Sequence, residues 1–294
     1  MRILLVEDNP VNREVAYGML EAFNCLIDTA ENGREAVAAT AATDYALVFM
    51  DCQMPEMDGF AATRLIREHE AKRVGDTDSN ARPGIRRVPI VALTAHAMQG
   101  DRELCLAAGM DDHLTKPYTY SQLEHVLARW LPRGQTTLEE GCGATPSSPS
   151  RQTRGRQPTV PQRVETLGDT RVEATIIDQA ALAAIRELQR PGHPDILARI
   201  LSEYIDTSPV MVDRIRRAVL SKNAAELRAS AHCLKSSSAQ LGASVLAADC
   251  RELELMGAGH DLDRAHEILS ELEQHYTAAC TAFQAELEKG RSAA

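Results

Sequence analysis

The sequence predicts two folded domains of different class, a doubly wound α/β domain followed by an all-α helical bundle. Across residues 1–131, short apolar runs alternate with longer amphipathic stretches, the pattern of a five-stranded parallel sheet with helices on both faces. Residues 132–175 are rich in Gly, Pro, Ser, Thr, Gln and Arg, which predicts a disordered, flexible linker. Residues 176–290 lose the strand signals and carry the periodicity of long amphipathic helices.

Five short apolar runs are the expected strands of the first domain. They are Ile3–Val6, Cys25–Thr29, Ala46–Met50, Val88–Leu93 and about Asp112–Leu114. Between Glu70 and Arg87 the sequence becomes polar and gains Gly and Pro, so a long loop is expected before the fourth strand.

In the second half, breaks between helices are expected near Pro191, near Gly242 and at residues 257–259. One apolar stripe predicts the core of the bundle: Ile196, Ile200, Tyr204, Val212, Ile215 and Val219.

Composition and charge exclude several classes of protein. The 294 residues are 44% hydrophobic, enough for two ordinary domains with cores. The formal net charge of -10 argues against nucleic acid as a direct partner, because phosphate contacts need clustered Lys and Arg. No apolar run approaches the roughly 20 residues of a membrane span, so we expect a cytoplasmic protein without a membrane span. The seven cysteines show no CxxC pair or zinc-type spacing, and we expect reduced thiols.

Polar side chains follow four of the predicted strands at the point where each strand ends. Glu7 and Asp8 follow the first strand, Asp51 the third, Thr94 the fourth and Lys116 the fifth. In an open parallel sheet, ligands collect at the carboxyl ends of the strands. The sequence therefore predicts one site that contains three carboxylates, a hydroxyl and an ammonium group.

Three converging carboxylates repel one another unless a cation lies among them, so Mg²⁺ is the expected cofactor. The backbone carbonyl of Gln53 is a further candidate ligand beside Asp51. In such a site Asp51 attacks a phosphorus atom, while Lys116 and Thr94 contact the phosphoryl oxygens. The expected product is an aspartyl phosphate.

The segments LLVEDNPVNREV, MDCQMPEMDGFAAT, PIVALTAHA and AAGMDDHLTKP resemble the receiver domain of two-component response regulators, which has a flavodoxin-like fold. The resemblance covers about residues 1–131. It implies that Glu7 and Asp8 are metal-binding acids and Asp51 is the phosphoacceptor. It also implies that Thr94 is the switch hydroxyl and that Lys116 contacts the phosphate.

The same resemblance concerns three further residues. His113 stands where receivers often carry an aromatic switch residue; the alternative is a partly exposed histidine on the last strand. Pro117 is expected to follow a cis peptide, as in such domains. Cys52 is expected to be a core residue, because alternation along a strand turns its side chain away from that of Asp51.

A second candidate site lies on a predicted helix around His232. Helical spacing places His232, Lys235 and Ser236 on one face, where a phosphate-accepting histidine gains from a nearby cation and a hydroxyl donor. The segments AHCLKSSSAQLGA and LAADCRELE resemble the histidine phosphotransfer (HPt) domain. This resemblance implies that His232 is phosphorylated and that Lys235 supports it, with Ser236 where many members have Gly.

Together the two resemblances imply a phosphorelay intermediate of the kind found in the C-terminal part of hybrid sensor histidine kinases. The expected partners are a sensor histidine kinase and another receiver or HPt protein. The sequence has no Gly-rich nucleotide loop and no ATP-binding box, so we expect a phosphotransfer protein without a kinase core. A phosphatase of the haloacid-dehalogenase type is disfavoured, since Gln53 occupies the position of its second Asp.

Two alternatives stay open from the sequence. One is a C-terminal part of a hybrid kinase whose catalytic core lies elsewhere; the Met1 start, one residue before the first strand, favours a stand-alone product or a trimmed form. The other is a binding switch in which phosphorylation of Asp51 moves the surface near Thr94 and His113. Whether Asp51 and His232 exchange phosphate within one chain, and in which direction, also stays open.

Overall fold

The computed structural model describes residues 1–75, 87–94, 99–131, 176–190 and 192–293. The described residues of the α/β domain and of the helical bundle belong to one compact unit. The predicted linker, 132–175, lies outside the described residues, as does most of the loop predicted before the fourth strand.

The α/β domain contains a five-stranded parallel sheet in the order β2-β1-β3-β4-β5. All five predicted strands are confirmed, with ends that shift by one or two residues. Their bounds are β1 Arg2–Val6, β2 Leu26–Ala30, β3 Leu47–Asp51, β4 Ile90–Thr94 and β5 Asp112–Thr115. Because β1 and β3 are neighbours and Val6 pairs with Met50, the residues that follow β1 lie beside the end of β3.

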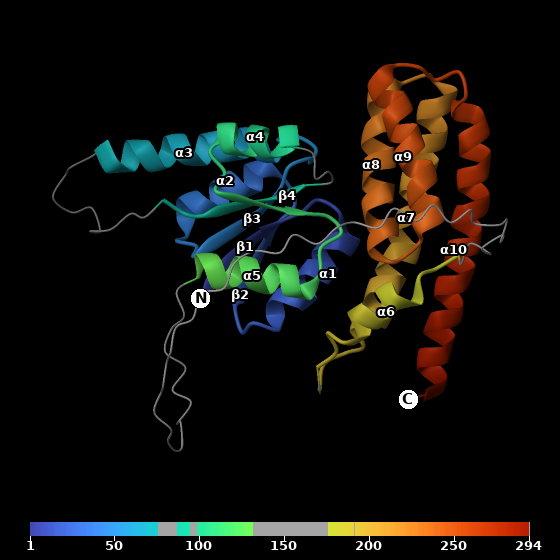
Figure 1. The fold of residues 1–294 in the computed structure, drawn as a ribbon, viewed down its shortest axis with the longest axis horizontal. Helices are drawn as coiled ribbons and strands as arrows, with labels where there is room; N and C mark the ends of the chain where they lie inside the picture. The colour runs from blue at the N-terminus through green and yellow to red at the C-terminus, as the bar shows by residue number, and fades with distance from the viewer. Residues whose placement is uncertain (76–86, 95–98, 132–175, 191, 294) are drawn as a thin grey trace, which may run out of the picture. The chain divides into compact units, whose positions relative to one another are not determined.

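Helices α1 to α5 cover the two faces of this sheet (Figure 1). They are α1 Pro10–Glu21, α2 Gly33–Ala42, α3 Gly59–Gly75, α4 Gln99–Ala108 and α5 Tyr120–Trp130. Helices α1 and α5 share one apolar core with the sheet, and α2, α3 and α4 share the other. This is the doubly wound arrangement that the alternating pattern predicted.

Helix α3 is longer than the sequence pattern suggested. The long loop was expected from Glu70, but the helix continues to Gly75, so this boundary was wrong. The residues that follow Glu70 are Ala, Lys and Arg, which are good helix formers despite their polarity. Glu70 is also held by Arg67 one turn earlier, at 2.8 Å.

Helices are the regular secondary structure of the second half over its described residues, which contain no strand, as predicted. Its helices are α6 Gln179–Arg186, α7 Ile196–Leu220, α8 Ala224–Gln240, α9 Ser244–Gly259 and α10 Ala265–Ala293. The predicted apolar stripe is buried, with every member at most 7% exposed. Asp178, Asp195 and Asn223 cap the N-termini of α6, α7 and α8 with their side chains. None of the helices in the described part of the chain has the length and apolar character that crossing a bilayer requires.

Gly242 ends α8 in a left-handed conformation, with φ of 77°. Its neighbours also leave no room for a side chain, because an added Cβ would lie 2.8 Å from the carbonyl oxygen of Asp178. Gly192 has a similar φ of 81°, but no described atom lies within 4 Å of the position of its Cβ. Substitutions at the two glycines therefore separate the cost of backbone strain from the cost of crowding.

We expect Gly242→Ala to destabilise the bundle more than Gly192→Ala does. Both variants carry the cost of a left-handed alanine, about 1 kcal/mol. Gly242→Ala adds a steric cost of about 1 kcal/mol or more. Urea denaturation followed by far-UV circular dichroism measures both; equal midpoints for the two variants would show that crowding at Gly242 is unimportant.

Candidate functional site

Three acidic side chains meet at the carboxyl edge of the sheet. Glu7 and Asp8 follow β1, Asp51 ends β3, and one carboxylate oxygen from each lies within 4.8 Å of the other two. Glu7 is fully buried, Asp51 is 4% exposed, and Asp8 is partly buried. The structure thus brings together the three carboxylates that the strand ends predicted.

Lys116, just beyond β5, contributes a cation to this pocket. Its Nζ lies 2.5 Å from Glu7 Oε2 and 2.6 Å from Asp51 Oδ2, and its side chain is 8% exposed. The Lys116 backbone N–H donates to the carbonyl of Thr94 at 2.7 Å, which joins the ends of β4 and β5. The peptide between Lys116 and Pro117 is cis, as predicted.

Burial perturbs the ionisation of these groups. It raises the pKa of Glu7 to about 8, against the opposing effect of Lys116. Burial also raises the pKa of Asp8 to about 6, and the neighbouring charge of Asp51 adds to this. Burial opposes the charge on Lys116, but Asp51 and Glu7 outweigh it and raise the pKa of the ammonium above its ordinary value.

The charges of the pocket fit a divalent cation. Three ionised carboxylates against one ammonium leave two negative charges without compensation in a buried place, which is costly. Oxygen ligands at this spacing are those that Mg²⁺ prefers. The donor set of Glu7, Asp8 and Asp51 is therefore suited to Mg²⁺.

The remaining predicted residues of this half are Gln53, Thr94 and His113. The backbone N–H of Gln53 donates to Asp51 Oδ1 at 3.1 Å, so Gln53 is adjacent, while the role of its carbonyl stays a prediction. Thr94 is buried at the end of β4. His113 lies within β5 with its side chain 34% exposed and its Nδ1 4.0 Å from Asp112 Oδ1. Its switch role stays a prediction.

Cys52 follows the pattern expected of a core residue. It is 5% exposed and packs in the core on the α2, α3 and α4 side of the sheet. Its Sγ lies 4.0 Å from Sγ of Cys105 on α4.

His232 lies in α8 and is held by an acid of the next helix. Its Nδ1 is 2.7 Å from Oε1 of Glu254, and Nζ of Lys235 is 2.5 Å from Oε2 of the same carboxylate. An ionised carboxylate only accepts hydrogen bonds, so Nδ1 must be the protonated ring nitrogen. In the neutral ring this leaves Nε2 with the free lone pair.

Glu254 was not singled out from the sequence, although a signal was present. The buried positions of α9 are Leu246, Cys250, Leu253, Glu254 and Gly257, so a carboxylate occupies the apolar face. A charged side chain at such a position requires a partner. Burial raises the pKa of Glu254, but the hydrogen bonds from His232 and Lys235 outweigh it and lower the pKa to about 2.

Residues next to His232 on α8 contact the acidic pocket. The side-chain amide of Asn12 donates to Glu7 Oε1 and to Oγ of Ser236, both at 2.9 Å. The amide of Asn9 donates to the carbonyl of Cys233 at 3.1 Å. Sγ of Cys233 also lies 3.9 Å from a carboxylate oxygen of Asp8. The helix that carries the candidate phosphohistidine thus lies against the candidate aspartate site.

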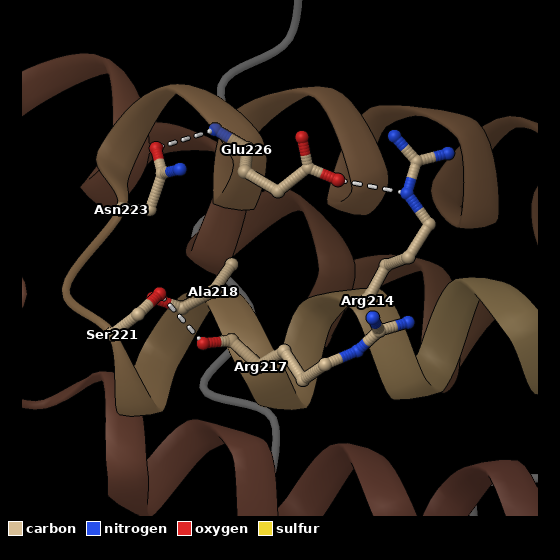
Figure 2. Close-up of a pocket in the computed structure, with 6 residues that line it drawn as sticks. All are labelled: Arg214, Arg217, Ala218, Ser221, Asn223 and Glu226. Carbon is tan, nitrogen blue, oxygen red and sulfur yellow. Dashed lines mark hydrogen bonds and ion pairs between the residues drawn. The ribbon is translucent and has the colours of Figure 1, made fainter.

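A separate cavity of about 340 Å³ lies at the junction of α7 and α8 (Figure 2). Within it, Arg214 Nε lies 2.7 Å from Glu226 Oε1, and the Asn223 side chain accepts from the backbone N–H of Glu226. Ser221 Oγ donates to the carbonyl of Arg217. Arg214, Ser221 and Asn223 thus find partners among the lining residues, and neither candidate phosphoacceptor lines the cavity.

Parts of both halves of the chain match known protein families. Residues 3–128 match the response regulator receiver domain, and residues 199–285 match the Hpt domain. Sensor histidine kinase GacS of Pseudomonas protegens is 30% identical over 275 residues, which make up 92% of this chain and 26% of that protein. Probable histidine kinase 1 of Oryza sativa subsp. indica is 38% identical over 149 residues, 45% of this chain and 15% of that protein. The chain thus spans about a quarter or less of these two curated relatives.

Parts of the chain are also similar to solved structures. The receiver domain of the sensor histidine kinase PA1611 from Pseudomonas aeruginosa, solved with a magnesium ion in its active site cleft, is 44% identical, with a TM-score of 0.37. The match covers 44% of this chain and 95% of that one. A co-crystal structure of Ypd1 and the Ssk1 receiver domain from Saccharomyces cerevisiae contains a 34% identical chain, with a TM-score of 0.40, covering 44% of this chain and 88% of that one. From the two family matches, the chain carries a response regulator receiver domain and an Hpt domain and is a phosphorelay component.

Proposed function

We propose that Asp51 and His232 are the two phosphoacceptors of this phosphorelay component and that they exchange a phosphoryl group. The observation that carries the proposal is the contact between their surroundings. Asn12 donates one hydrogen bond to Glu7 in the acidic pocket and one to Ser236, one turn beyond His232. Phosphoryl transfer needs mainly positioning and charge compensation, and both are available where α8 meets the pocket.

In transfer from His232 to Asp51, the bond between Nε2 and phosphorus breaks as a carboxylate oxygen of Asp51 forms a bond to phosphorus. The imidazole recovers its lone pair, and Nδ1 keeps its proton on the side of Glu254. We assign the contacts with the phosphoryl oxygens to Lys116 and to the hydroxyl of Thr94. Transfer in the opposite direction reverses these changes.

Glu7, Asp8 and Asp51, with the carbonyl of Gln53, are the residues that would hold Mg²⁺. When bound, the ion supplies positive charge to the phosphoryl oxygens. Burial disfavours the charged forms of Glu7 and Asp8, so a cation in the pocket would favour their ionised forms.

Lys235 and Glu254 act on the histidine side of the reaction. Glu254 fixes the protonated ring nitrogen of His232 and, through its second oxygen, holds Lys235 nearby. In this position the Lys235 ammonium offsets the charge that a phosphoryl group brings to the histidine. Glu254 is a positioning residue and not a phosphoacceptor.

A sensor histidine kinase is the proposed source of the phosphoryl group, and another receiver or Hpt protein is the proposed further partner. One observation supports a second arrangement, in which the kinase core belongs to the same polypeptide. In GacS, the stretch that matches 92% of this chain is only 26% of a sensor histidine kinase. An immunoblot of the source cells with antibody against this chain separates the two by the mass of the native product. Location in the cytoplasm stays a prediction.

The assignment is tested by treating the protein with Mg²⁺ and acetyl phosphate and mapping the phosphorylated residue by mass spectrometry. We expect label on Asp51 in the wild type, followed by label on His232. Asp51→Asn is expected to remove both, and His232→Gln only the second. Omission of Mg²⁺ with EDTA present should abolish labelling of Asp51. Label on His232 in Asp51→Asn would show that the histidine does not receive its phosphoryl group from this aspartate.

Glu254→Gln is expected to slow the appearance of label on His232 by about tenfold, because the loss of one charged hydrogen bond costs roughly 1.4 kcal/mol. Loading of Asp51 should be unchanged. Glu252→Gln is the matched control, since its half-exposed carboxylate lies on the same helix. An equal rate in Glu254→Gln and wild type would contradict the positioning role.

The lowered pKa of Glu254 also predicts how acid affects the bundle. The carboxylate has a folded pKa of about 2 against an ordinary value of 4.5. Its stabilising effect is therefore complete above about pH 4.5 and is lost as the pH falls towards 2. Urea midpoints measured between pH 5 and pH 2.5 should fall more steeply in wild type than in Glu254→Gln, and parallel curves would be the contrary result.

A further inference from the structure

Three residues of α1 lie on one stripe of that helix, because Glu14, Gly18 and Glu21 are spaced by four and three positions. Gly18 is the unexpected member, since glycine inside a helix costs about 1 kcal/mol relative to alanine. A Cβ at Gly18 would lie 2.3 Å from Cδ1 of Ile196 on α7. The missing side chain is therefore what allows the Ile196 side chain to rest on α1.

Polar contacts flank this apolar contact on both sides. One turn before Gly18, Oε2 of Glu14 lies 2.8 Å from Nε of Arg199, with both side chains partly exposed. At the other end, the guanidinium of Arg190 donates to the backbone carbonyl of Glu21, at the C-terminus of α1. A cation is favoured at that end of a helix. An apolar centre with a polar rim is the usual construction of a specific interface.

Helix α1 contacts α7 and α8 through different residues. Asn9 and Asn12, in and before the first turn, contact Cys233 and Ser236 on α8. The stripe described above contacts the N-terminal end of α7 and the segment before it. The two sets position α1, and with it the acidic pocket, against the helix of His232.

We propose that Glu14 and Gly18 of α1, with Arg199 and Ile196 of α7, are specificity determinants that select the chain's own receiver as the partner of His232. This inference rests on the proposed function, in which Asp51 and His232 exchange a phosphoryl group. A receiver with a side chain at the place of Gly18, or a basic residue at the place of Glu14, fits this Hpt surface less well. The partner is thus selected by the space that Gly18 leaves and by the charge of Glu14, separately from the phosphoacceptors themselves.

The experiment measures transfer between Asp51 and His232 in the full chain, together with hydrogen exchange of the α1 amides in the absence of any phosphodonor. Glu14→Arg and Arg199→Glu should each slow transfer by about five- to tenfold through like-charge repulsion. Their combination should restore the rate to within about twofold of wild type, because the pair is reversed and not removed. Each single variant should also increase exchange of α1, and the double variant should reverse this.

A second, independent pair of substitutions tests the contact between Gly18 and Ile196. Gly18→Leu should slow transfer and loosen α1, and the added Ile196→Ala should recover part of both by returning space. Glu103→Arg is the matched control, an exposed acid on α4 whose reversal should change neither readout. Loading of Asp51 by acetyl phosphate should be unchanged in every variant, which shows that the receiver is folded.

The outcomes separate this inference from the function on which it rests. Transfer that proceeds at the wild-type rate in Glu14→Arg and Gly18→Leu would overturn the specificity role and leave the phosphoacceptors in place. A second outcome is that hydrogen exchange of α1 changes in the Glu14/Arg199 and Gly18/Ile196 variants while His232 is never labelled. This result would uphold the contact of α1 with α7 and overturn phosphoryl transfer between Asp51 and His232. Single variants that are slow without rescue in either double variant would also count against specific pairing.

Discussion

The ion pairs of the Lys116 ammonium with two buried carboxylates are the interaction on which the receiver half depends. A charge inside a protein is tolerated only when it is paired and hydrogen-bonded. Lys116 contacts both Glu7, which follows β1, and Asp51, which ends β3. It therefore joins the end of β5 to the ends of β1 and β3, and it holds an otherwise repulsive group of acids together. The order of the strands is what makes this possible, since β1 and β3 are neighbours and their carboxyl ends meet.

The Hpt half solves the same problem with the charges reversed. There a single buried carboxylate, Glu254, lies between two nitrogen donors, His232 and Lys235. The low pKa of Glu254 follows from these two hydrogen bonds. In the receiver, one cation serves two anions and leaves negative charge for a metal ion. In the Hpt domain, the charges of Glu254 and Lys235 balance, and the neutral ring of His232 keeps the lone pair of Nε2. The receiver site is thus left with negative charge that suits a metal ion, and the Hpt site is left with a nucleophilic nitrogen beside an ammonium group.

Much of the fold could be predicted from the sequence, because strand and helix periodicities are local. The strands were expected within one or two residues, and the rule for the carboxyl ends of parallel strands predicted that Glu7, Asp51 and Lys116 lie together. The end of α3 was missed since polarity was taken for a loop where the residues favour a helix. Glu254 was missed for a different reason: periodicity shows that a position is buried, but not which side chain from another helix it meets. The contact of Gly18 with Ile196 was missed for the same reason, because the two residues are far apart along the chain.

Asn12 gives its two amide hydrogens to different domains, one to Glu7 in the acidic pocket and one to Ser236 on the Hpt helix. One planar amide group thus contacts the acidic pocket of the receiver and also helps to bind the Hpt helix. Thermodynamic linkage then requires reciprocity. Whatever alters the bond between Asn12 and Glu7 changes the free energy of docking, and docking changes the pocket by the same amount. Any ligand of the aspartate site that alters the bond between Asn12 and Glu7 is therefore coupled to attachment of the histidine helix.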